Sequence, residues 1–271
     1  MPDTFPNGKK IPEGLDFLQL VWQQEDDCES ETDKALPKMG EKAPQCIREL
    51  GTVLSLLDRL ASCFWGCSKG DHVIEYLAGR ACSFARAALR LTRLGFYDEA
   101  LVLVRSVGEI SNLLVLFCQE DVLLQKWKLS NHDQRRKEFD PVKVRIAIEK
   151  MGKPIPMSRD KYARLCEKVA HVTPETKPQN YNVHGRPVAE GYFQEAGVLV
   201  AINEVSEFVA WVTLCAAKLL FGVSERRQTI REAGIRLLVS VGRADVLTIE
   251  GYFEGLRKNS QNPWSGGNES T

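Results

Sequence analysis

The sequence has no excess of charge of either sign and no long uncharged apolar run. Its 36 basic and 36 acidic residues give a formal net charge of zero, which excludes polybasic, whole-chain binding of nucleic acid but not a local basic patch. The most apolar stretch, residues 198–221, still carries four polar side chains: Asn203, Glu204, Glu207 and Lys218. A membrane-spanning helix needs about 20 residues with few or no charges, so we expect a long core helix here and no membrane segment.

The sequence also lacks the usual catalytic signatures. It contains no G-x-x-x-x-G-K-[ST] phosphate loop, no G-x-G-x-x-G, no H-E-x-x-H and no G-x-S-x-G. The sequence therefore gives no support for four common activities: nucleotide hydrolysis, hydride transfer, zinc-dependent proteolysis and serine-dependent hydrolysis. We expect no cofactor.

The cysteines carry no sign of a disulfide framework. Eight of them are present, mostly within apolar helical stretches, where a thiol behaves as a small hydrophobe. The N-terminus has neither a basic region nor an apolar run, so we expect reduced cysteines and a cytoplasmic protein. Cys63 and Cys67 are followed by His72, but zinc sites usually need a second ligand pair at a comparable spacing. We therefore predict no metal site.

Apolar residues recur at helical spacing through almost the whole chain, which predicts an all-α fold. We expect one helical bundle domain over residues 44–258, preceded by an acidic, partly disordered segment over 1–43 and followed by a tail over 259–271. The acidic segment has a net charge of −5 from ten acidic and five basic residues, and we expect it to be mobile apart from a short helix over 16–24.

The helical periods predict nine helices within the domain. The helix over 97–118 is apolar nearly all round, so other helices should surround it. A loop over 172–190 separates two of the helices and has room for a small hairpin over 182–188. The expected helices cover residues 47–64, 71–94, 97–118, 120–138, 141–151, 158–170, 190–221, 224–241 and 248–258.

Arg105 and Glu109 form the first candidate polar group. They lie four residues apart, so they face each other across one turn of the helix over 97–118. Because that helix is apolar on all sides, we expect the pair to be at least partly buried. Either it offers a fixed guanidinium to an anion, or it is a structural ion pair that holds neighbouring helices in register.

Arg164 and His171 form the second candidate group. In a regular α-helix, seven residues bring two side chains to one face, about 10 Å apart. An arginine can clamp a phosphate and a histidine can move a proton near neutral pH, which together suit metal-independent cleavage of RNA. The same pattern also describes an ordinary solvated helix face, with His171 near the helix C-terminus.

A basic stretch surrounds this second group. Residues 126–168 hold thirteen basic and six acidic residues, a net charge of +7. The excess fits binding of a polyanion such as RNA. It equally fits intramolecular pairing with the acidic segment, or a salt-bridged surface. His184, two residues from Arg186 in the long loop, is a further candidate catalytic histidine, although a solvated loop histidine is a sufficient explanation.

Two segments resemble the signatures of a bacterial all-helical family of unknown function. Residues 95–109 match Gly-x-Tyr-x-Glu-Ala-x(4)-Arg-Ser-x-x-Glu, and Tyr162-x-x-Leu165-Cys166 followed by His171 resembles a Tyr-x-x-Leu-Ser helix that ends in histidine. In this chain Cys166 stands in the serine position, and His171 comes one position late. That family is placed near the HEPN (higher eukaryotes and prokaryotes nucleotide-binding) superfamily, and the resemblance covers about residues 75–220.

The resemblance implies a HEPN-like helical protein, and with it a function. Active members of that superfamily are ribonuclease toxins and defence effectors with an Arg-x(4–6)-His motif, so it implies a metal-independent ribonuclease in toxin biology or anti-phage defence. Arg164 and His171 would be catalytic, with Arg105, Glu109 and Tyr162 in support and two motifs facing each other in a homodimer. The alternative is a non-catalytic helical adaptor that binds a protein partner, for which an exposed apolar patch is expected.

Overall fold

The computed structural model describes Lys10, Pro174 and residues 12–67, 70–171, 188–243 and 245–254. Within these ranges every regular element is a helix, which confirms the predicted all-α bundle. The C-terminal tail over 259–271, the hairpin expected over 182–188 and His184 lie outside the described residues.

The described elements follow the predicted order from the second helix onward, except that the helix expected over 120–138 is divided into α5 and α6. In chain order they are α1 (Gly14–Ala35), η1 (Leu36–Lys38), α2 (Lys42–Ala61), α3 (Val73–Arg93), α4 (Tyr97–Phe117), α5 (Asp121–Leu129), α6 (His132–Glu138), α7 (Pro141–Lys150), α8 (Arg159–Leu165), η2 (Cys166–Ala170), α9 (Glu195–Phe221), α10 (Glu225–Ser240) and α11 (Val246–Glu254).

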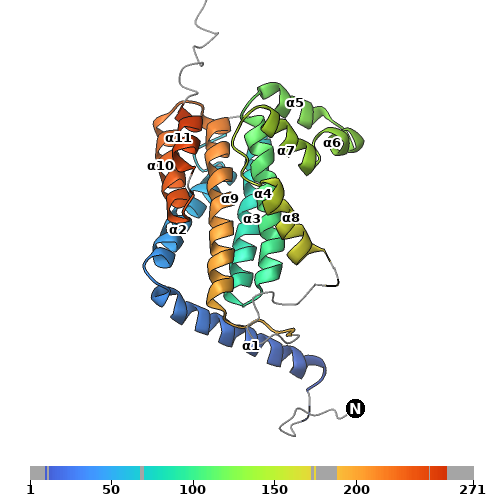
Figure 1. The fold of residues 1–271 in the computed structure, drawn as a ribbon, viewed down its shortest axis with the longest axis vertical. Helices are drawn as coiled ribbons and strands as arrows, with labels where there is room; N and C mark the ends of the chain where they lie inside the picture. The colour runs from blue at the N-terminus through green and yellow to red at the C-terminus, as the bar shows by residue number, and fades with distance from the viewer. Residues whose placement is uncertain are drawn as a thin grey trace, which may run out of the picture.

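The long helices α2, α3, α4, α9 and α10 run roughly along one axis, with α9 in the middle (Figure 1). α9 packs against all four of the others, and Phe208 and Trp211 are fully buried within it. α4 is also central, as predicted, but α9 is the more completely enclosed helix. Because a helix that is apolar on every side must be surrounded, α9 fixes where its neighbours lie.

Two of these helices, α4 and α9, are long and apolar enough to cross a membrane by length and composition alone. In each of them most of the apolar stretch is buried inside the bundle. The core helix of a soluble protein has the same properties. Two of the polar residues of α9, Glu204 and Glu207, are partnered within the bundle, as described below.

α1 is longer than the short helix expected over residues 16–24. It spans 22 residues and lies across one end of the bundle (Figure 1). Most of the acidic segment is therefore helical, and two of its acidic residues, Glu29 and Asp33, are paired with α3.

Ion pairs hold α1 on α3. Arg93 reaches both Glu29, at 2.6 Å, and Asp33, at 2.5 Å, and Arg90 also contacts Glu29. The hydroxyl of Thr32, which is fully buried, donates to the backbone oxygen of Arg93 at 3.0 Å. Glu29 and Asp33 thus pair with α3. The alternative in which the acidic segment pairs with the basic stretch over 126–168 therefore does not apply to these two residues.

The turn between α3 and α4 requires a glycine. Gly95 has φ +82°, and a Cβ there would lie 2.4 Å from the backbone nitrogen of Tyr192. The buried Tyr97 follows, and its hydroxyl donates to the oxygen of Tyr192 at 3.1 Å and accepts from the amide of Gln194 at 2.8 Å. The start of α4 is therefore joined to the segment that leads into α9.

Trp211 provides a test of the core. Its side chain is fully buried in α9, so Trp211→Ala should lower the free energy of unfolding by about 3–5 kcal/mol, the usual cost of emptying such a site. Trp22→Ala, on the exposed face of α1, is the matched control and should stay within about 0.5 kcal/mol. Urea denaturation measures both. Equal losses would show that Trp211 does not anchor the core.

Candidate functional site

A cleft of about 390 Å³ opens among α3, α4, α7 and α8. Its walls combine apolar and aromatic side chains with a few charged ones, as ligand pockets usually do. The lining residues are Arg80, Phe84, Ser106, Glu109, Ile110, Asn112, Leu113, Phe139, Pro141, Val144, Arg145, Met157 and Tyr162.

Arg145 is the least expected residue in this cleft. It lies on α7 between Val144 and Ile148, and only 9% of it is exposed. Its guanidinium lies 5.8 Å from the ring centroid of Tyr162, and among the described residues no carboxylate pairs with it. Because Arg145 faces the cleft and has no carboxylate partner among the described residues, this position favours an anionic ligand.

Arg105 and Glu109 pair with each other across one turn of α4, as their spacing predicts, and Arg105 stands beside Tyr162. The Nε of Arg105 lies 3.4 Å from the Oε1 of Glu109, and both side chains are half-buried. Arg105 also donates to the Sγ of Cys166 at 3.5 Å and lies 5.9 Å from the Tyr162 ring centroid. Glu109 and Tyr162 line the cleft itself, whereas Arg105 lies behind them.

Burial shifts the protonation of this group. Burial, with Asp140 nearby, raises the pKa of Glu109 although Arg105 opposes the shift. Burial by itself lowers the pKa of the Arg105 guanidinium. Cys166 and Glu109 together have the larger effect, so the pKa of Arg105 is raised overall. Burial, together with Cys166, also raises the pKa of Tyr162. Tyr162 therefore stays a hydrogen-bond donor at neutral pH.

Asn112 and Gly108 of α4 position one wall of the cleft. The Asn112 amide donates to the backbone oxygen of Met157 and accepts from its amide, both at 2.9 Å. A Cβ at Gly108 would lie 2.1 Å from the Met157 methyl group, so only glycine lets this side chain approach. The chain that leads into α8, and with it Tyr162, is held by these contacts.

Arg164 does not line the cleft. Its Nη2 lies 2.5 Å from Glu204 on α9, a carboxylate that also forms an ion pair with Lys161, whose Nζ lies 3.1 Å from its Oε2. Lys161 reaches Glu207 as well, at 2.6 Å, and Arg243 pairs with the same carboxylate. Arg164 is thus part of a network that neutralises two buried carboxylates of the core helix.

The helix that carries Arg164 also ends differently from the prediction. Residues 166–170 form η2, a π-helical turn, and the backbone N–H of His171 donates to the Cys166 oxygen five residues earlier at 2.8 Å. His171 itself is extended, with φ −100° and ψ 137°, and exposed. The α-helical spacing that would place Arg164 and His171 on one face does not hold here, because a π-turn contains more residues per turn.

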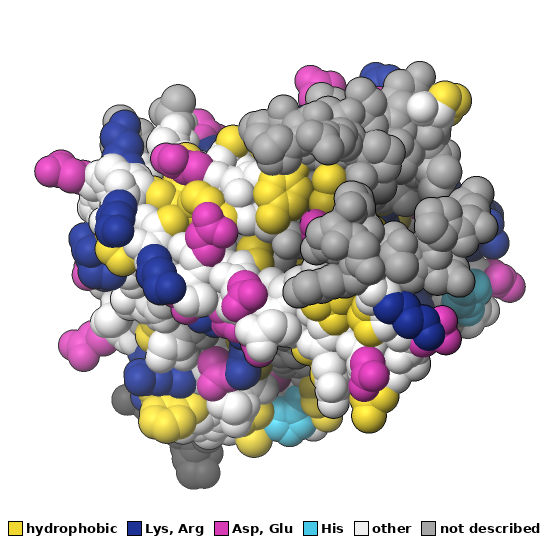
Figure 2. All heavy atoms as spheres, turned by 90° about the horizontal axis from the view of Figure 1, so that it is seen from below, with side chains coloured by type: hydrophobic (Ala, Val, Ile, Leu, Met, Phe, Trp, Pro, Cys, Tyr) yellow, Lys and Arg dark blue, Asp and Glu magenta, His cyan; other side chains and the backbone are white. Residues whose placement is uncertain are grey.

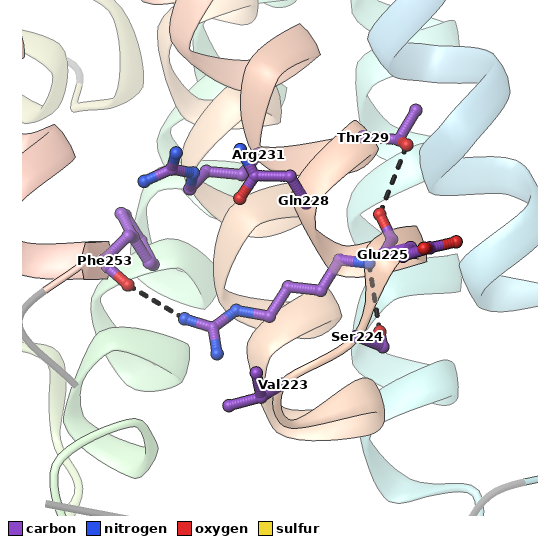
Figure 3. Close-up of a pocket in the computed structure, with 8 residues that line it drawn as sticks. Val223, Ser224, Glu225, Gln228, Thr229, Arg231 and Phe253 are labelled. Carbon is purple, nitrogen blue, oxygen red and sulfur yellow. Dashed lines mark hydrogen bonds between the residues drawn. The ribbon is translucent and has the colours of Figure 1, made fainter. Parts of the chain in front are cut away.

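A second hollow, of about 570 Å³, lies at the turn between α9 and α10. Arg227 donates there to the backbone oxygens of Gly222, at 2.7 Å, and Phe253, at 2.9 Å. Figure 3 shows Val223, Ser224 and Phe253 around this hollow. Ser224 caps α10 through the amide of Arg227. Because this arginine holds the ends of two helices, the hollow serves the fold rather than a ligand.

One group of described residues has the composition of a metal site. Cys63, Cys67 and His72 lie in the α2–α3 connection, and their potential ligand atoms all lie within 4.8 Å of one another. All eight cysteines are free thiols, consistent with the expectation that they are reduced. Comparison with known protein families, curated proteins and solved structures yields no match to the chain.

The sequence analysis missed Arg145, although a signal for it exists. The helical period of α7 places Val144, Arg145 and Ile148 on one buried face, so an arginine in that pattern interrupts an apolar stripe. Because α7 is short and polar overall, its composition does not distinguish Arg145 from a surface arginine. No histidine accompanies this arginine either, so the sequence shows no catalytic pair at this position.

Glu109 provides a test of the electrostatics of the cleft. Because folding raises the pKa of Glu109, the protonated carboxyl group favours the folded state. This stabilisation is fully present below the ordinary glutamate pKa of about 4.3 and is lost as the pH rises through the raised pKa. The free energy of unfolding of the wild type, relative to Glu109→Gln, should therefore fall as pH rises through that window. Urea titrations at a series of pH values measure the difference. A rise would show that the ion pair with Arg105 outweighs burial.

Proposed function

We propose that the chain binds RNA and holds one nucleotide in the cleft among α3, α4, α7 and α8. The observation that carries the proposal is the buried Arg145, which has no carboxylate partner among the described residues. A phosphate group supplies the charge that this guanidinium needs, and arginine suits it because its planar fork binds two phosphate oxygens at once.

The other walls of the cleft suit the rest of a nucleotide. Tyr162 and Phe139 offer aromatic faces on which a base can stack, and single-stranded RNA is held mostly in this way. Ser106 and Glu109 provide polar groups for a hydroxyl or a base edge. The volume of about 390 Å³ lies in the range of small-ligand pockets. The basic stretch over 126–168 contributes α7 and α8 and supplies longer-range attraction.

Arg145→Gln tests the binding proposal. The variant removes a charge-assisted hydrogen bond of about 1.5–3 kcal/mol, so affinity for a labelled single-stranded oligoribonucleotide should fall roughly 10- to 100-fold. Fluorescence polarisation at fixed salt measures it. Because the variant also removes an unpaired buried charge, the fold should persist, which circular dichroism checks.

Arg136→Gln is the matched control for that experiment. Arg136 is exposed on α6 within the same basic stretch, so its loss should weaken binding only slightly. Equal losses from both variants would mean that overall charge, and not the cleft, binds RNA. Wild-type affinity in Arg145→Gln would contradict the proposal.

Cleavage of RNA is the finer part of the proposal, as a HEPN-like ribonuclease in toxin biology or anti-phage defence. Its support is the resemblance, together with the exposure of His171 at the end of η2, where a substrate can reach it. Arg105 stands beside Glu109 and Tyr162 at the cleft, whereas Arg164 pairs with Glu204 on α9 and does not line it. Two copies facing each other would complete such a site.

His171→Ala tests cleavage. If His171 moves the proton of the 2′-hydroxyl, total RNA incubated in EDTA should be cut by the wild type to products that end in a 2′,3′-cyclic phosphate or a 3′-phosphate. His171→Ala should abolish the cutting, while His132→Ala, at another exposed histidine, should leave it unchanged. Identical RNA patterns from the wild type and His171→Ala would remove the ribonuclease proposal.

A protein-binding role is the second candidate, and one observation favours it. Leu15, Leu18 and Trp22 follow one another at helical spacing on α1, and all three are exposed. The molecule viewed from below, from the end where α1 lies, shows hydrophobic side chains spread among acidic and basic ones (Figure 2). If the RNA-binding test above fails, the exposed apolar residues of α1 favour a non-catalytic adaptor that binds a protein partner.

A further inference from the structure

The connection between α2 and α3 brings four potential metal ligands together within thirteen residues. Cys63 and Cys67 belong to the turn, His72 precedes the first residue of α3, and Glu75 lies in its first helical turn. The Sγ of Cys63 lies 3.3 Å from the Nδ1 of His72, and Cys67 completes a group within 4.8 Å. In a tetrahedral zinc site, with zinc–sulfur bonds of about 2.3 Å and zinc–nitrogen bonds of about 2.0 Å, ligand atoms lie about 3.5 Å apart.

Glu75 lies beside two of these three residues, His72 and Cys63, and is the candidate for a fourth ligand. Its side chain is only 4% exposed. Its Oε1 lies 3.8 Å from the Nδ1 of His72 and 4.0 Å from the Sγ of Cys63, and no lysine or arginine pairs with it among the described residues. Buried carboxylates are normally paired or coordinate a metal.

The backbone is strained at the same residues. In the part of the chain that the structure describes, Cys63, with φ +53°, and His72, with φ +50°, are the two non-glycine residues in the left-handed region. Such conformations cost about 1–3 kcal/mol each and cluster at functional sites. Gly66, with φ +92°, closes the turn by donating its N–H to the Cys63 oxygen at 2.8 Å, which brings Cys67 back toward Cys63.

The turn is also fixed to the rest of the bundle. Trp65, between the two cysteines, packs edge-on against Phe221 at the end of α9, with ring centroids 5.7 Å apart. Arg226 of α10 lies 5.2 Å from the centroid of the same tryptophan ring. A rigid frame therefore holds the ligands, as a structural metal site requires.

We propose that Cys63, Cys67, His72 and Glu75 form a structural zinc site that joins the end of α2 to the start of α3. Two thiolates and an imidazole favour zinc over magnesium or calcium, and four protein ligands make a closed site without a position for substrate. The sequence prediction of no metal site rested on the absence of a second cysteine or histidine pair. In this proposal Glu75, in the first turn of α3, supplies the fourth ligand instead of a second pair.

Cobalt provides the first test, because it reports ligand type and geometry. The full-length chain, freed of metal with a chelator and kept reduced, should bind one equivalent of Co²⁺. The complex should show the intense visible bands of a tetrahedral site and a thiolate charge-transfer band, both removed by one equivalent of Zn²⁺. Failure to bind stoichiometrically, or the weak spectrum of an octahedral ion, would overturn the proposal.

Variants assign the ligands. Cys63→Ser and His72→Ala should lose the tetrahedral spectrum, and Glu75→Gln should weaken binding while keeping the thiolate band. Cys82→Ser is the matched control, since Cys82 is a buried cysteine of α3 outside the group, and it should bind as the wild type does. The same loss in Cys82→Ser and Cys63→Ser would contradict the assignment.

A measurement on the wild type alone covers the case in which the variants fail to fold. Zn²⁺ should protect Cys63 and Cys67 from alkylation, and a chelator should restore their reaction, as read by mass spectrometry. Equal alkylation with and without Zn²⁺ would overturn the proposal. So would a Cys63–Cys67 disulfide that persists when both reductant and Zn²⁺ are present.

Discussion

The enclosure of α9 by four helices is the constraint on which the rest of the structure depends. The buried carboxylates on that helix need partners inside the bundle, because burial removes most of their contact with water. Glu204 and Glu207 obtain theirs from Lys161, Arg164 and Arg243. The position of α8, and hence of Tyr162 at the cleft, follows from the need to neutralise two carboxylates of the core.

The segment over 95–109 divides into two parts with different roles. Gly95 and Tyr97 close the α3–α4 turn against the chain before α9, which is a requirement of folding. Ser106 and Glu109 lie on the cleft and Arg105 lies behind it, which is where a ligand would be bound. One segment thus combines residues that build the bundle with residues that face its opening, and substitutions in the two parts should differ in what they impair.

The long helices were predictable because their apolar periods are strong, and α3, α4, α9 and α10 begin and end close to their expected positions. The length of α1 was not predictable from composition, since its acidic residues look solvated until Arg90 and Arg93 are placed beside them. The candidate site was predicted in part: Arg105, Glu109 and Tyr162 do gather. Arg164 could not be assigned correctly, because its partner Glu204 is forty residues away in the chain.

The π-helical turn η2 also accounts for the position of His171. An i→i+5 hydrogen bond closes around one residue more than the bond of an α-helix. A chain that gains one residue in this helix therefore widens locally, instead of rotating every later side chain by about 100° around the axis. Up to Leu165 the helix is a regular α-helix, so Lys161 and Arg164, which pair with carboxylates of α9, lie before the wider turn.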